Sequence, residues 1–111
     1  MNEENKKTIM IADDERHTRD ALERFFRKKY QVTLAEDGER AVNLLQRNNY
    51  DLILTDLNMP GASGMEVIDA ALKKSPPPIC IVFTAYGSIE NAIAAIKRGA
   101  TDFVTKPVNL E

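Results

Sequence analysis

Five short apolar runs alternate with four stretches of helical periodicity, and this alternation constrains the fold more than any other feature of the chain. The runs are rich in Ile, Val, Leu, Phe and Thr, which is the usual composition of β-strands. They cover residues 8–12, 31–35, 52–55, 79–84 and 102–105. Strands that alternate with helices predict an α/β fold, with helices on both faces of a mostly parallel sheet.

The helical stretches cover residues 18–29, 38–48, 64–74 and 88–98. The last has the clearest pattern, because Ile89, Ala92, Ile93 and Ile96 follow the i, i+3, i+4, i+7 spacing of one helix face. This series predicts the face that the helix turns toward the core.

Capping residues support these helix boundaries. Asp37 stands directly before Gly38 and can cap the second helix, while Ser63 and Glu66 have the spacing of a capping box before the third. Gly99 can adopt the positive φ that often ends a helix, here the fourth.

The polarity of the runs predicts their order in the sheet. Residues 52–54 and 79–83 are continuously apolar, as central strands of a parallel sheet are, whereas 31–36 and 102–105 are more polar and suit the edges. We therefore expect a doubly wound five-stranded parallel sheet with the order 2-1-3-4-5. In this order the chain connections diverge between strands 1 and 3, which leaves a crevice for a ligand.

A fifth helix is expected after the fifth strand, but only residues 108–111 follow Pro107. The fifth helix is therefore expected to be missing or truncated. We interpret residues 8–111 as one domain excised from a longer protein, preceded by a polar extension at 1–7; a natural four-helix form is the alternative.

Composition excludes several other classes of protein. The net charge is −2 and hydrophobic residues make up 43% of the chain, which suits a globular domain and argues against a polyanion-binding surface. The apolar runs are too short to cross a bilayer, and a single cysteine cannot form an internal disulfide. Because residues 1–7 are polar, we expect no signal sequence before the domain. We expect a cytoplasmic protein.

Five polar residues stand at the ends of the predicted strands: Asp13 and Asp14 after the first, Asp56 after the third, Thr84 at the end of the fourth and Lys106 after the fifth. The carboxyl ends of parallel strands meet at one edge of a sheet. Converging carboxylates repel each other, so a cation is needed, and an oxygen-only ligand set suits Mg²⁺. A metal, a lysine and a hydroxyl around one aspartate can accept a phosphoryl group as an aspartyl phosphate.

Each residue alone has a simpler explanation. Asp13 or Asp14 could cap the first helix, Thr84 could be an ordinary strand residue, and Lys106 could belong to a turn. Their coincidence at one edge of the sheet favours a functional site.

These residues and their neighbours resemble the receiver domain of bacterial two-component response regulators, over residues 8–107. The motifs that carry the resemblance are Asp13-Asp14, the run from Leu54 to Gly61 around Asp56, Gly64-Met65-Glu66, Thr84-Ala85 and Phe103-Val104-Thr105-Lys106-Pro107. Residues 84–107 are most similar to receivers of enhancer-binding, nitrogen-regulatory-type transcription activators. The resemblance implies a flavodoxin-like receiver fold.

The resemblance also implies roles for individual residues. Asp56 would be the phosphoacceptor, and Mg²⁺ would be bound by Asp13, Asp14, Asp56 and the backbone carbonyl of Asn58. Thr84 and Lys106 would contact the phosphoryl group.

Further implied roles concern the switch and the lifetime of the phosphoryl group. Thr84 and Phe103 would form the switch, Asn58 and Tyr86 would tune the lifetime, and the Lys106–Pro107 peptide would be cis. Phe103 replaces the tyrosine often found at its position, so its part in a switch must work through ring packing.

The implied partners are a sensor histidine kinase as phosphoryl donor and an output domain in the full-length protein, with ATPase and DNA-binding functions in enhancer-binding activators. The domain itself would be a regulatory phosphoacceptor, not an enzyme for a separate substrate, and would bind neither nucleic acid nor membrane. Relatives use the surface of the fourth helix, fifth strand and fifth helix for homodimerisation and output, and the missing helix puts that surface in doubt.

Two other functions remain open. An aspartate-nucleophile phosphatase of the haloacid-dehalogenase type needs a second Asp two residues after the nucleophile, where this chain has Asn58. A constitutive interaction module would typically lack the acidic pair, the acceptor or the lysine, all of which are present here.

Overall fold

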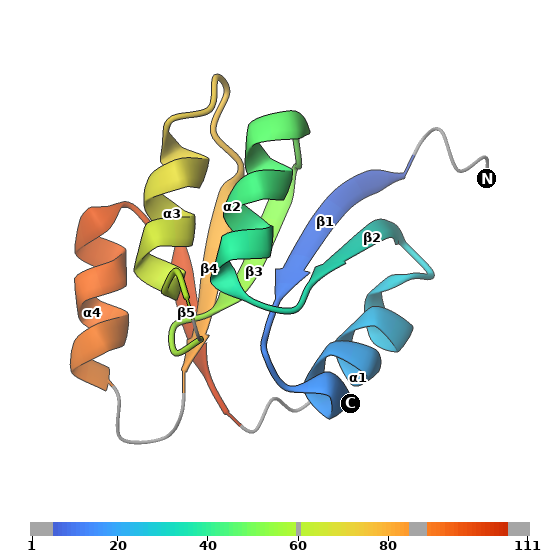
Figure 1. Cartoon of the computed structure of the whole chain (residues 1–111), viewed down its shortest axis with the longest axis horizontal. Coiled ribbons are helices and arrows are strands. Elements are labelled where there is room, and N and C mark those ends of the chain that lie inside the picture. The colour runs from blue at the N-terminus through green and yellow to red at the C-terminus, as the bar shows by residue number, and fades with distance from the viewer. Residues whose placement is uncertain (1–5, 60, 85–88, 107–111) are drawn as a thin grey trace.

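The computed structural model describes residues 6–59, 61–84 and 89–106. Within them, five strands alternate with four helices (Figure 1). The elements are β1 (Lys7–Ala12), α1 (Arg16–Phe26), β2 (Tyr30–Ala35), α2 (Gly38–Arg47), β3 (Leu52–Asp56), α3 (Gly64–Leu72), β4 (Ile79–Thr84), α4 (Ile89–Arg98) and β5 (Asp102–Thr105).

The strands form one parallel sheet in the order β2-β1-β3-β4-β5, which confirms the predicted fold and strand order. The two polar strands, β2 and β5, lie at the edges. β1 and β3 are neighbours, with Ala12 paired with Thr55, so the loops after these two strands start side by side.

Helices cover the two faces of the sheet unequally. Among the described helices α1 lies on one face and α2, α3 and α4 lie on the other (Figure 1). Side chains of β1 alternate between the faces: Ile9 and Ile11 pack with Leu22 of α1, and Met10 packs in the larger cluster under the other helices.

The helix caps agree with the sequence except at α1. The Asp37 side chain accepts a hydrogen bond from the Arg40 backbone, and Ser63 and Glu66 form a complete capping box. The N-cap of α1 is Glu15, so neither Asp13 nor Asp14 caps that helix. The two aspartates are therefore available for another role.

Only Ala92 of the predicted apolar face of α4 is buried. Ala92 and Ala95 are fully buried, whereas Ile89, Ile93 and Ile96 are 42%, 46% and 37% exposed. Small alanine side chains let the helix axis approach its neighbours closely, and the larger isoleucines are then directed outward. The apolar spacing located the helix correctly but not the side that packs.

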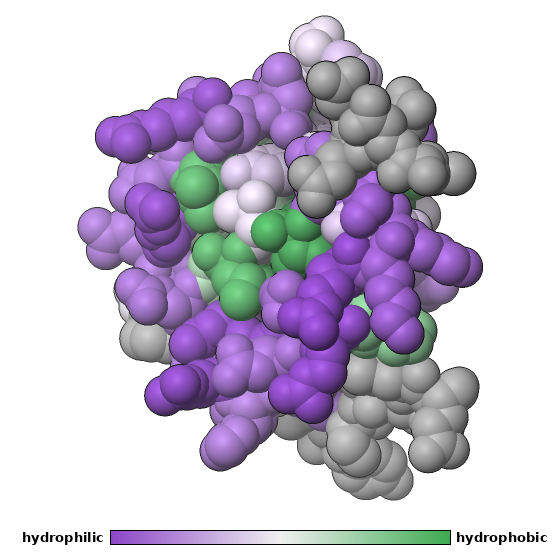
Figure 2. Space-filling model, turned by 90° about the vertical axis from the view of Figure 1, so that its right-hand side faces the viewer, coloured by the Kyte–Doolittle hydropathy of each residue, from purple (hydrophilic) through white to green (hydrophobic). Residues whose placement is uncertain are grey.

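Apolar side chains are also exposed on the α1 side of the sheet. Ile79 of β4 and Val104 of β5 point to this face, and they are 54% and 42% exposed. Figure 2 views the molecule from the side on which β2 and α1 lie in Figure 1, which is the edge opposite β5; this side is mostly hydrophilic around a central apolar patch. Residues 107–111, where a fifth helix would begin, lie outside the described part of the chain.

None of the described helices has the length and apolar character that a bilayer crossing requires.

Candidate functional site

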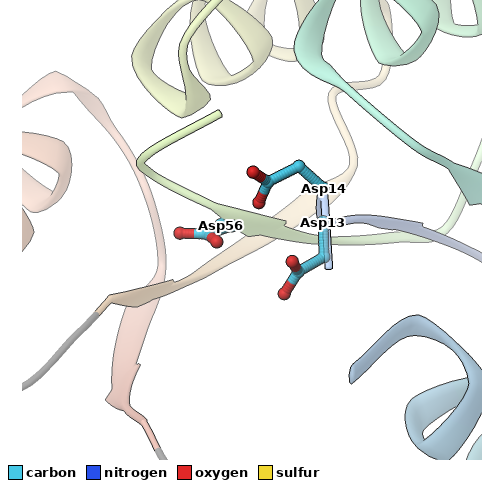
Figure 3. Close-up of side chains that lie close together, drawn as sticks. All are labelled: Asp13, Asp14 and Asp56. Carbon is cyan, nitrogen blue, oxygen red and sulfur yellow. The ribbon is translucent and has the colours of Figure 1, made fainter. Parts of the chain in front are cut away.

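Three aspartates meet at the carboxyl edge of the sheet. Asp13 and Asp14 directly follow β1, and Asp56 is the last residue of the neighbouring strand β3. One carboxylate oxygen from each lies within 4.8 Å of the others, and the three side chains gather around one place (Figure 3). Asp13 and Asp56 are buried and Asp14 is exposed, so the cluster opens to solvent on the Asp14 side.

Lys106 brings a positive charge to this cluster from the end of β5. Its Nζ lies 2.7 Å from Asp56 Oδ2 and 3.2 Å from Asp13 Oδ2. To reach them, the side chain passes over β4, where its Nζ lies 5.1 Å from the ring centre of Phe83. The sequence placed Lys106 at this edge; the structure brings it into contact with two of the three acids.

The electrostatics of the cluster are unbalanced. Burial raises the pKa of Asp13, and the nearby charge of Asp56 adds to this effect against the opposing influence of Lys106. Burial alone would lower the pKa of Lys106, but Asp56 and Asp13 together raise it. The site thus contains one lysine and three carboxyl groups. A further positive charge is required to offset the repulsion between the carboxylates.

The oxygen atoms of the acids differ in what they already bind. Asp13 Oδ1 accepts a hydrogen bond from the Glu15 backbone N–H at 2.8 Å, and Asp56 Oδ1 accepts one from the Asn58 N–H at 3.0 Å. Asp13 Oδ2 is buried, and its contact among the described residues is the ion pair with Lys106 at 3.2 Å. The residues present therefore fit a hard divalent cation such as Mg²⁺, because three carboxylates offer converging oxygen ligands and one lysine does not balance their charge.

Thr84 has an uncommitted group of its own. The residue is fully buried at the end of β4, and its hydroxyl has no hydrogen-bond partner among the described residues. Its backbone carbonyl accepts a hydrogen bond from the Lys106 N–H at 2.8 Å, which ties the ends of β4 and β5 together. A buried hydroxyl without an acceptor is uncommon and suits a ligand that brings one.

Three contacts around the site could not be read from the sequence. Arg19 Nη1 donates to the backbone carbonyl of Asp13 at 2.9 Å, and the Phe83 ring lies beneath Lys106. A Cβ atom on Gly64 would lie 2.3 Å from the Asp56 carbonyl oxygen, so the β3–α3 loop returns tightly onto the strand end. An arginine near a helix start is usually solvated, and nothing in its spacing marks this contact.

Two of the other predicted site residues are described by the structure, and the rest fall outside the described residues. Asn58 is exposed two residues after Asp56, and Phe103 is half-buried in the cluster under α2, α3 and α4. Tyr86 and the Lys106–Pro107 peptide fall outside the described residues.

The Asp13→Asn variant is expected to be more stable than the wild type at pH 7 when no metal is bound. The pKa of Asp13 is higher in the folded chain than its ordinary value of 3.8, so its stabilising contribution is complete below that value. This contribution is lost as the pH rises through the raised pKa. Denaturant unfolding in EDTA at pH 7 and pH 3.5 measures the effect, which should vanish at the lower pH.

Asp51→Asn serves as the control for this measurement and should have the opposite sign. Hydrogen bonds from the Thr8 backbone and side chain lower the pKa of Asp51, so its stabilising contribution is present above pH 3.8 and is lost as the pH falls. A loss of stability in Asp13→Asn at pH 7 would contradict the electrostatic imbalance described above.

Comparison with known proteins agrees with this geometry. Residues 9–111 match the model of the response regulator receiver domain. The chain is 39% identical over 94% of its length to a cyclic di-GMP phosphodiesterase of Thermotoga maritima and 39% identical over 95% to the response regulator protein PilR of Pseudomonas aeruginosa. It is 37% identical over 96% to the transcriptional regulatory protein ResD of Bacillus subtilis.

These matches cover 28%, 24% and 45% of the three relatives, so the chain spans less than half the length of each.

Among solved structures, the receiver domain of Francisella response regulator 1452 matches 95% of this chain and 88% of its own, with a TM-score of 0.84 and 30% identity. With the match of the family model over nearly its whole length, the chain belongs to the receiver domain family of two-component response regulators.

Proposed function

We propose that Asp56 accepts a phosphoryl group from a phosphohistidine on a sensor histidine kinase and that the modified domain then changes conformation to control an output domain. The observation that carries this proposal is the position of Asp56, which lies beside two further carboxyl groups and 2.7 Å from a lysine ammonium. A carboxylate with a cation at hand is equipped to attack phosphorus.

Asp13, Asp14, one oxygen of Asp56 and the carbonyl of Asn58 would hold Mg²⁺, which supplies positive charge that offsets repulsion between the carboxylates and the phosphoryl oxygens. A carboxylate oxygen of Asp56 forms a bond to phosphorus while the phosphorus–nitrogen bond of phosphohistidine breaks. The electron pair of that bond leaves with the imidazole. Lys106, already in contact with Asp56, neutralises charge on the transferred group.

Thr84 would respond to phosphorylation of Asp56. Its hydroxyl, which has no hydrogen-bond partner among the described residues, can donate to a phosphoryl oxygen. Movement of Thr84 would then open space for the half-buried ring of Phe103. Changing the ratio of the two conformations from 1:99 to 99:1 needs about 5.5 kcal/mol of differential binding. One hydrogen bond to a charged group supplies about 1.5–3 kcal/mol. Lys106, the metal or the repacking of Phe103 must therefore supply the rest.

Thr84→Ala is expected to retain phosphorylation at Asp56 but to lose part of the structural response of α4. The variant removes the hydroxyl and leaves the backbone bond between Thr84 and Lys106 in place. NMR chemical shifts of α4 with and without beryllium fluoride, a phosphoryl mimic, measure the response. Thr84→Ser, which keeps the hydroxyl, should respond like the wild type, and equal shifts in the alanine variant would contradict this role.

The finer features of the switch follow from the family resemblance. Asn58 and Tyr86 would set the lifetime of the phosphoryl group, and the Lys106–Pro107 peptide would be cis. The output would be transcription activation of the enhancer-binding kind in the cytoplasm, with α4 and β5 used for output or homodimerisation. The relative named as a transcriptional regulatory protein supports a transcriptional output. The relative named as a cyclic di-GMP phosphodiesterase supports a different kind of output for a receiver-containing chain.

Incubation with acetyl phosphate and Mg²⁺ tests the proposed function. Intact-mass measurement should show the addition of one phosphoryl group, and EDTA should prevent it. Repeated turnover of a small phosphate ester would instead favour a phosphatase, although Asn58 lacks the carboxylic acid that this chemistry needs. An unchanged mass would favour a constitutive interaction module and would overturn the proposal.

A further inference from the structure

A groove of about 450 Å³ lies at the corner where α1 leads into β2. It is at the opposite end of the sheet from the acidic site, because α1 runs back from the carboxyl end of β1 to the start of β2. Apolar surface bordered by hydrophilic residues is visible on this side of the molecule (Figure 2). The groove is lined by Arg24, Phe25, Phe26, Lys28, Lys29 and Tyr30.

Three aromatic rings form the apolar part of the groove. The rings of Phe25 and Phe26 meet edge-to-face with centroids 4.9 Å apart, and those of Phe26 and Tyr30 do so at 5.7 Å. Phe26 and Tyr30 pack against the core cluster beneath α1, so they are held in place. Phe25 is 49% exposed beside this fixed pair and offers an apolar contact surface to a ligand.

Positive charge surrounds these rings. Residues 24–30 contain four cations and no carboxylate, although the whole chain has a net charge of −2. Arg24, Lys28 and Lys29 form no ion pair with any residue that the structure describes. Arg27 forms one long ion pair, with Glu23 at 3.9 Å. This local excess of unpaired cations is complementary to an anionic ligand.

The backbone at the groove favours dispersed carboxylates over a compact phosphate. The groove lies at the C-terminal end of α1, where the helix dipole favours no anion, so attraction must come from the side-chain cations. The N–H groups of Arg27 and Lys29 already donate to Glu23 and Phe26 carbonyls, so they are not free to hold a phosphate. Flexible cations spread along residues 24–29 can instead pair with carboxylates spaced along an extended chain.

We propose that this groove binds an acidic peptide segment of a partner protein, with one apolar residue of the segment placed against Phe25. Arg24, Lys28 and Lys29 would pair with carboxylates on either side of that residue. The surface is separate from the phosphoacceptor site, so binding should not depend on the state of Asp56.

Fluorescence anisotropy of a labelled peptide tests this proposal on the whole chain. The peptide has one phenylalanine with three acidic residues on each side, and the reference peptide has glycine in place of the phenylalanine. We expect the phenylalanine peptide to bind more tightly, and its affinity should fall as the salt concentration rises, because exposed charge pairs are screened.

Matched charge reversals locate the binding surface. Lys28→Glu/Lys29→Glu should weaken peptide binding by about tenfold or more. Arg47→Glu/Lys97→Glu makes the same change in net charge at the exposed ends of α2 and α4 and should leave binding within about twofold. Phe25→Ala should remove the difference between the two peptides, and since the ring is half exposed this variant should still fold.

The outcomes separate this proposal from its alternatives and from the function proposed above. Equal weakening by both charge-reversal pairs, or equal binding of both peptides by the wild type, would overturn it. Tighter binding of ATP than of the peptide would identify a nucleotide site and would also overturn it. Unchanged peptide binding by Asp56→Asn is expected, so loss of phosphorylation and loss of this groove are measured independently.

Discussion

Replacing Asp56 with asparagine is expected to abolish phosphoryl uptake from acetyl phosphate. An amide lacks the charged oxygen that attacks phosphorus, and the neighbouring carboxyl groups of Asp13 and Asp14 belong to the proposed metal site. Asparagine keeps the shape of the side chain and one oxygen, so the fold should be retained. Intact mass before and after incubation with Mg²⁺ and acetyl phosphate measures the uptake.

Asp37→Asn is the matched control for this experiment. Asp37 also follows a strand at the carboxyl edge of the sheet, and asparagine can accept the same capping hydrogen bond from the Arg40 N–H. This variant should take up phosphoryl as the wild type does. Continued uptake by Asp56→Asn would show that another side chain is the acceptor.

The second large effect is expected from Gly64→Ala, which should destabilise the fold by about 3 kcal/mol or more. A Cβ atom at this position would lie 2.3 Å from the Asp56 carbonyl oxygen and 2.6 Å from Leu57 Cα, and both are backbone atoms that cannot rotate away. Relief of the clash must move α3 or the end of β3, which carries Asp56. The free energy of unfolding measured with denaturant should therefore fall, and phosphoryl uptake at Asp56 should be reduced.

Gly61→Ala provides a contrast within the same loop. Gly61 has φ of 75°, and among the described residues a Cβ atom there would meet the Glu39 side chain at 3.8 Å. The expected cost is backbone strain of about 1–2 kcal/mol, without displacement of the strand. Equal stability of Gly64→Ala and the wild type would contradict the close approach of α3 to the strand end.

The sequence predicted the sheet well because its strands differ in polarity. The continuous apolar character of residues 52–54 and 79–83 indicated central strands, and the more polar residues of β2 and β5 indicated edges. Strand order then placed Asp13, Asp14 and Asp56 at one edge, where their carboxylates are found together. Secondary structure and charge were sufficient for this part of the site.

Close packing was not predictable from the same pattern. The spacing predicted a face of Ala92 with three isoleucines for α4, but the side that packs is formed by Ala92 and Ala95. The Arg19 contact with the Asp13 carbonyl likewise depends on the direction of α1 relative to the end of β1, which no local spacing encodes. Such contacts depend on distances between elements, and periodicity carries no information on them.

The backbone bond from Lys106 to the carbonyl of Thr84 has a practical consequence for hybrid receivers assembled from two parents. The tips of β4 and β5 are joined at the rung formed by Thr84 and Thr105, so the hydroxyl and the ammonium belong to one mechanical unit. If the crossover point lies between β4 and β5, Thr84 comes from one parent and Lys106 from the other. The hydroxyl and the ammonium are then positioned by strands that did not evolve together. Both tips should therefore be exchanged together, as a single cassette.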